Sequence, residues 1–107
     1  MLLVTLPKIN KFEFLFDDYP NNRGKRLVLR CDVSGSPKPT IEFQKDGVTL
    51  RNDSRLYRKR DSVLHIENVT YQNDEGLYRC VATNDHGKVF EEKEIRVPSK
   101  FAALYAF

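Results

Sequence analysis

Apolar and polar residues alternate with a period of two along most of the chain, as they do in β-strands with one buried face. In the run RLVLRCDV, the odd-numbered positions from Leu27 to Val33 are apolar or cysteine, and Arg30 and Asp32 fall on the other side. The runs TIEFQKDG, SVLHIENV, GLYRCVAT and KVFEEKEIRV alternate in the same way. No long stretch has a helical period, so the pattern predicts an all-β domain.

Turn signals separate these runs: YPNNRG, SGSPKP, KDG and NDHG. Asp46-Gly47 is typical of a tight hairpin, and in NDHG we expect Gly87 to supply a positive φ. Residues from Thr5 to Phe16 predict one or two edge strands, because an edge tolerates the interruption by Pro7. Many short strands between such turns predict an immunoglobulin-like antiparallel β-sandwich, with two sheets joined in Greek-key order.

The two cysteines of the chain lie on predicted core strands of opposite sheets. A disulfide between Cys31 and Cys80 would therefore clamp the two layers and stabilise the domain. Phe43 is an inward aromatic placed to pack on this bond. Tyr78, two residues before Cys80, has the position of a tyrosine corner, whose ring is buried and whose hydroxyl bonds a backbone group.

The composition narrows the range of possible functions. The chain has 107 residues, of which 40% are hydrophobic and 31% charged, and its net charge of +3 does not call for nucleic acid. The histidines, His65 and His86, lack a carboxylate at a spacing that suggests catalysis, and we expect surface or turn roles for both. We therefore expect a protein that is not an enzyme and has no cofactor and no metal site.

The stretches LRCDVSGSPKPTIEFQKDG and LHIENVTYQNDEGLYRCVATNDHG resemble immunoglobulin domains of the intermediate set. The resemblance extends over residues 24–97, and its most specific part is the pattern D-x-G-x-Y-x-C. In this chain the pattern is formed by Asp74, Gly76, Tyr78 and Cys80.

The resemblance also implies structural roles for single residues. The family usually has a tryptophan where this chain has Phe43, which implies looser packing but not a different fold. In the family, the aspartate of the motif pairs with an arginine on the crossover between the sheets. We therefore expect Asp74 to pair with Arg55, or failing that with Arg58.

A narrower resemblance involves LHIEN, GLYRC and RVPSKFAALYAF, which look like the membrane-proximal domain of the basigin family, namely basigin, neuroplastin and embigin. The family's members act in adhesion and as ancillary subunits of monocarboxylate transporters. The resemblance implies a domain at residues 1–98, and a juxtamembrane link or the start of a transmembrane helix at residues 99–107. An apolar linker or a tail is the alternative for the last segment.

Surface features fit this setting. Asn52 and Asn68 each begin an N-glycosylation sequon. A basic group could bind heparan sulfate or anionic lipid, but we favour a solvated edge strand whose charges prevent pairing with other chains. This basic group consists of Arg51, Arg55, Arg58, Lys59 and Arg60.

The sequence thus predicts a non-catalytic protein-recognition module on the extracellular side of the plasma membrane. In this interpretation it is the membrane-proximal ectodomain of a single-pass glycoprotein, its partners are proteins, and a transporter subunit is one of them. One alternative is an intracellular structural domain of a muscle-type array. Another is an ectodomain module of a different adhesion or guidance receptor.

Overall fold

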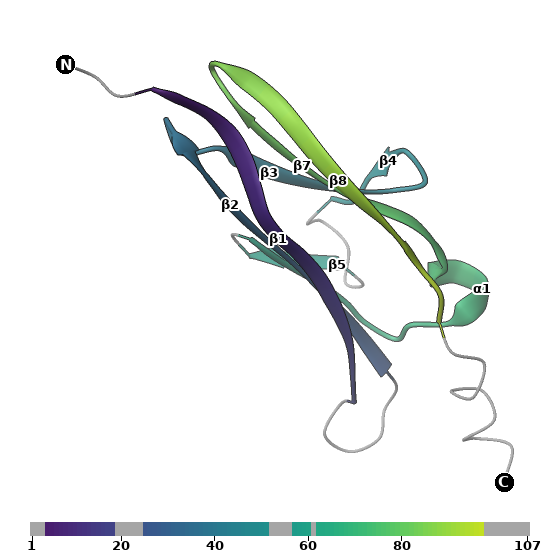
Figure 1. Ribbon diagram of the computed structural model, residues 1–107. Helices are drawn as coiled ribbons and strands as arrows, with labels where there is room; N and C mark the ends of the chain where they lie inside the picture. The colour runs from purple at the N-terminus through teal and green to yellow at the C-terminus, as the bar shows by residue number, and fades with distance from the viewer. Residues whose placement is uncertain (1–3, 19–24, 52–56, 61, 98–107) are drawn as a thin grey trace, which may run out of the picture.

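A computed structural model of the chain describes residues 4–18, 25–51, 57–60 and 62–97 (Figure 1). Most of this part of the chain lies in strands, and a single helical turn precedes the strand that carries Cys80. The elements are β1 (Thr5–Asp18), β2 (Lys25–Ser36), β3 (Thr40–Lys45), β4 (Val48–Thr49), β5 (Tyr57–Arg60), β6 (Val63–Ile66), α1 (Tyr71–Asp74), β7 (Gly76–Asn84) and β8 (Gly87–Ile95).

The strands form two antiparallel sheets, with the orders β1-β2-β6-β5 and β4-β3-β7-β8. This arrangement confirms the predicted antiparallel sandwich. β1 is a single edge strand paired with β2, and its register is irregular between Thr5 and Lys8 and again between Ile9 and Lys11. β1 and β8 are the edges of different sheets, and they lie along each other on one side of the molecule (Figure 1).

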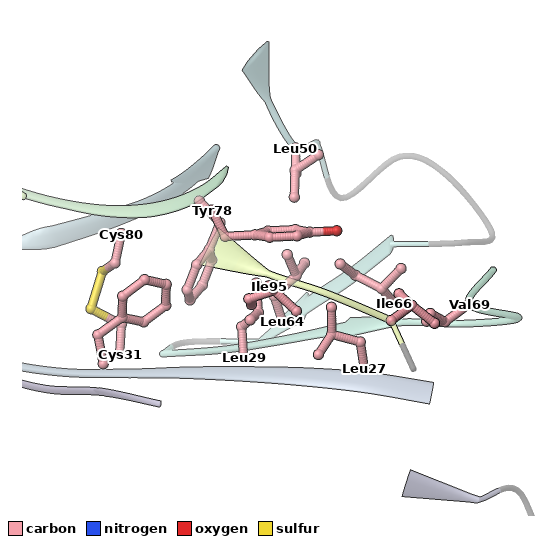
Figure 2. Packing of buried hydrophobic residues seen from close by; sticks show 13 residues of the cluster. Leu27, Leu29, Cys31, Leu50, Leu64, Ile66, Val69, Tyr78, Cys80 and Ile95 are labelled. Atoms are coloured by element: carbon pink, nitrogen blue, oxygen red, sulfur yellow. A yellow bond between two sulfur atoms is a disulfide. The ribbon is translucent and has the colours of Figure 1, made fainter. Parts of the chain in front are cut away.

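The hydrophobic core lies between the sheets, where the alternating apolar positions of both layers meet (Figure 2). Leu27 and Leu29 from β2 and Leu64 from β6 project from one sheet, and Ile95 from β8 projects from the other. Full burial of an aliphatic side chain is worth about 1.5–3 kcal/mol relative to exposure. The period of two in the sequence therefore determines which side of each strand supplies this energy.

The two tight turns differ in how they use glycine. In the β3–β4 hairpin, Asp46 and Gly47 have φ angles of 50° and 84°, as a two-residue type I′ turn requires. The prediction of a positive φ at Gly87 was wrong, because the left-handed residues of the described chain do not include it. A Cβ at Gly87 would lie 2.9 Å from Cδ2 of Leu6, an exposed side chain that can shift, so the structure does not explain this glycine.

Candidate functional site

Cys31 on β2 and Cys80 on β7 form a disulfide that joins the two sheets, as predicted (Figure 2). Both cysteines are fully buried, and the described part of the chain contains no free cysteine. A nucleophilic cysteine must be a reduced and accessible thiol. Cys80 therefore has a structural role and not a catalytic one.

Phe43 and Tyr78 are the two largest fully buried side chains of the core. Phe43 on β3 is opposite Cys80 in the register of the sheet, and its ring centroid lies 6.4 Å from that of Phe12 on β1. The ring of Tyr78 is buried, and its hydroxyl donates a hydrogen bond of 2.7 Å to the backbone carbonyl of Asp74. This bond satisfies the polar end of a side chain that the core otherwise encloses.

Asp74 ends α1 and is the buried acidic group of the described chain, with 7% of its surface exposed. The backbone N–H of Thr70 donates to its Oδ2 at 2.7 Å. Burial raises the pKa of the Asp74 carboxyl above its ordinary value of 3.8, while the Thr70 N–H and the charge of Lys45 oppose the rise. The expected pair with Arg55 stays a prediction, because Arg55 and the side chain of Arg58 lie outside the described residues.

The raised pKa of Asp74 predicts a pH dependence of stability. A carboxyl whose folded pKa exceeds the unfolded value binds protons more strongly in the native state. Its contribution to stability is complete below pH 3.8 and is lost as the pH rises through the folded pKa. The Asp74→Asn variant should lack this pH-dependent contribution of the carboxyl to stability. As the pH rises from acidic to neutral, the variant should therefore gain stability relative to the native chain.

Urea unfolding of the two chains across this range measures the difference, and carboxyl NMR titration gives the pKa directly. Glu42 and Asp46, whose pKa values are lowered, are present in both chains and cancel in the comparison. A pKa of Asp74 below 3.8 would contradict the prediction. It would instead favour the ion pair with Arg55, since a cation nearby stabilises the carboxylate.

A second contact, which the sequence did not reveal, fixes the β3–β4 turn against β7. The backbone N–H of Leu77 donates to Oδ1 of Asp46 at 2.9 Å, and the N–H of Asp46 donates to the carbonyl of Leu77 at 2.8 Å. A Cβ at Gly76 would lie 2.6 Å from Oδ2 of Asp46. Gly76, the glycine of the D-x-G-x-Y-x-C motif, therefore leaves the space that the carboxylate of Asp46 occupies.

Gly76→Ala should lower the free energy of unfolding by about 1 kcal/mol, because the added methyl group displaces the Asp46 carboxylate and breaks its hydrogen bond with the Leu77 N–H. In an Asp46→Gly background the same substitution should cost much less, because the colliding carboxylate is gone. Glycine is the replacement of choice at position 46, since φ there is 50°. Equal costs in both backgrounds, measured by urea unfolding, would contradict this account.

The structure describes only some of the remaining predicted residues. Asn68 is exposed, with a φ of 54°, between β6 and α1, whereas Asn52 lies outside the described residues. Arg51 is exposed. Of the other basic residues, the backbone of 58–60 belongs to β5 at the edge of its sheet, and their side chains are not described. The edge position agrees with the interpretation as a charged edge strand, which stays a prediction.

The two histidines lie far from each other in the fold. His65 is half-buried on β6. His86 is exposed in the turn between β7 and β8, where its backbone N–H donates to Oδ1 of Asn84. Within the described ranges, histidine, cysteine and acidic residues do not gather in groups of three that could hold a metal ion. In the same ranges, helices long and apolar enough to cross a membrane are absent, and residues 98–107 lie outside them.

The most distinctive exposed feature is on the outer face of the sheet β4-β3-β7-β8. Val81 points away from the core cluster yet is only 7% exposed, because side chains of the neighbouring strands cover it. Phe90 is opposite Val81 in the register and remains 52% exposed. We call this surface the Phe90 face, defined as the outward side chains of Glu42, Arg79, Val81, Lys88, Phe90 and Glu92.

Charged groups hold the Phe90 ring in place. The guanidinium of Arg79 lies 4.1 Å from the ring centroid, within the range of a cation–π interaction. Nη2 and Nε of Arg79 donate to Oε2 of Glu92 at 2.7 and 3.1 Å. On the neighbouring strand, donors from Gln44 and Thr49 hold the pKa of Glu42 below 4.5, and the charge of Lys88 adds to this effect. The face is therefore an aromatic ring within an ordered polar network.

The sequence contained a signal for this face that we did not use. Every second residue before the buried Ile95 lies on the inward side of β8. Phe90 is five positions before Ile95, so it lies on the outward side, among charged residues. A large aromatic at a polar position of an alternating strand indicates an interaction surface or local packing. Which side chains cover Val81 depends on the register between β7 and β8, and the sequence does not give that register.

Comparisons with known proteins agree with this architecture. The family model of the Immunoglobulin I-set domain matches residues 10–97. The muscle M-line assembly protein unc-89 of Caenorhabditis elegans is 36% identical over 81% of this chain, and mouse neogenin is 39% identical over 70% of it. The solved structure of Drosophila OTK, extracellular domains 3-5, matches with a TM-score of 0.70 at 31% identity, over 88% of this chain and 32% of that one.

The chain corresponds to a small part of these relatives. It covers 1% of unc-89 and 6% of neogenin. The similarity is therefore to a single domain of long proteins.

Proposed function

Since this chain belongs to the immunoglobulin I-set family, we propose that it is a non-catalytic protein-recognition domain of a cell-surface glycoprotein. Domains of this family and fold are generally non-catalytic, and they occur in proteins as different as neogenin and unc-89. Such a fold can present many different surfaces on one core, so the function depends on the exposed side chains and not on the sandwich itself.

The Cys31–Cys80 disulfide is the observation that carries the cell-surface setting. Disulfides persist in oxidising compartments and are rare in the cytosol. The likeness to extracellular domains of OTK supports the same setting. An exposed Asn68 within a sequon agrees with a glycan at that position.

The finer proposal is the membrane-proximal domain of a basigin-like protein whose partner is a membrane transporter subunit. It rests on LHIEN, GLYRC and the apolar residues 101–107 of the sequence. The amino acids that follow Phe107 in the parent protein test it. A continuous apolar run of about 20 residues is expected, and a polar sequence there would contradict it.

Thiol counting tests the setting. The protein is taken from its native source, denatured in urea so that the buried cysteines become accessible, alkylated at once and analysed by mass spectrometry, and we expect no alkylation of Cys31 or Cys80 before reduction. Treatment with a glycosidase that removes N-glycans should also reduce the mass at Asn68. Two free thiols would overturn the cell-surface proposal and favour an intracellular structural domain, which the similarity to a muscle M-line assembly protein supports as the second candidate.

A further inference from the structure

The Phe90 face has the organisation of a contact surface rather than of a solvated sheet. Phe90 is 52% exposed, and the guanidinium of Arg79, which is paired with Glu92, lies over its ring. An aromatic side chain that is already ordered loses little conformational entropy when it is buried by a partner. Aromatic and arginine side chains are also the residues that most often dominate binding energy at interfaces.

The charges along β8 identify the kind of partner. Lys88 precedes Phe90 by two residues and Glu92 follows it by two, so the three side chains point to the same side of the strand. A twofold axis that runs parallel to the sheet, outside it over Phe90 and at right angles to β8, exchanges the two charged positions. An antiparallel second copy would thus bring Lys88 of each chain to Glu92 of the other, while Phe90 meets Phe90.

We infer that the Phe90 face is a self-recognition surface, through which two copies of this chain associate face to face about a twofold axis. Such interfaces use the same patch on both subunits, so the patch must be complementary to itself. Lys88 and Glu92 meet this requirement, because the axis brings each opposite the other, whereas Glu42 lies in the row of Phe90 and Val81 and would face its own copy. The inference rests on the proposed recognition function and names its partner.

The opposite sheet provides a contrast. Leu15 on β1 is 53% exposed, nearly the same fraction as Phe90. Its neighbours two positions away on the same side of the strand are Glu13 and Asp17, which are both acidic. A second copy placed there about an axis at right angles to β1 would bring Glu13 against Asp17, and on β2 Arg30 against Arg26, so that like charges meet. Leu15 and Phe90 are therefore about equally exposed, and the two sites differ in the pattern of charges around them.

Sedimentation equilibrium of the 107-residue chain tests the inference. A single small patch predicts weak association, with a dissociation constant on the order of 0.1–1 mM. Phe90→Ala should weaken it at least about tenfold, as loss of a central aromatic does. Leu15→Ala is the matched control and should leave association unchanged. A native chain that stays monomeric at about 1 mM, or equal weakening by both variants, would overturn the inference.

A charge exchange distinguishes self-recognition from binding to another protein. Lys88→Glu and Glu92→Lys should each weaken self-association about tenfold, because like charges then meet across the axis. An equimolar mixture of the two variants recreates both opposite-charge contacts and should associate within about threefold of the native chain. A mixture that stays monomeric would overturn the twofold arrangement.

The outcome is separable from that of the proposed function. A monomer with an intact Cys31–Cys80 bond would overturn self-recognition alone and leave the face to a different protein. Free thiols in the native source would overturn the cell-surface setting whatever the chain's state of association.

Discussion

Replacing both Cys31 and Cys80 with alanine is expected to lower the free energy of unfolding by about 4 kcal/mol, a large part of the stability of a domain of this size. The bond closes a loop of 49 residues and joins the two sheets, so its loss mainly enlarges the conformational freedom of the unfolded chain. Urea unfolding of the native and double-alanine chains measures the difference.

Reduction provides the control for side-chain packing. The native chain, unfolded and refolded in a reducing buffer, keeps both sulfur atoms in the core and loses only the covalent bond. It should be destabilised by nearly the same amount as the double-alanine variant. A loss below about 1 kcal/mol in both cases would show that sheet packing alone holds the layers together.

The same measurement bears on where the protein functions. A domain that loses most of its stability on reduction is unsuited to a reducing compartment, whereas an intracellular module must remain folded with free thiols. A large effect therefore supports the cell-surface proposal, and a small effect favours the intracellular alternative.

The sandwich and its disulfide could be predicted from the sequence, because both depend on which side of a strand a residue faces. The period of two assigns Leu27, Leu29 and Cys31 to one side without knowledge of any partner strand. Turn pairs such as Asp46-Gly47 then divide the runs into strands. These signals are local, and the structure has them as expected.

The contacts that could not be predicted are those between residues far apart in sequence and close in space. The carboxylate of Asp46 lies where a side chain at Gly76 would be, and Leu6 of a distant strand lies close to Gly87. Strand alternation gives the face of a residue but not its neighbours across the sheet. Alternation along β8 places Phe90 outward, but which side chains surround it depends on strand register.

Phe43→Ala is expected to lower the free energy of unfolding by about 3–5 kcal/mol, the usual range for removing a buried aromatic ring. The side chain is fully buried beside the disulfide, and its ring packs on Phe12 of the other sheet. The substitution would leave a cavity between the layers that rigid strands cannot close. Urea unfolding at neutral pH, with the disulfide intact, gives the loss directly.

The matched control is Phe90→Ala, which removes the same ring from the outer face of the same sheet. It should cost less than about 1 kcal/mol, because half of that ring is already in contact with water. Similar losses for the two variants would contradict the assignment of Phe43 as the central core aromatic. Phe43→Trp adds the larger ring usual in the resembling domains, and a cost of about 1–3 kcal/mol would show that this core has repacked around phenylalanine.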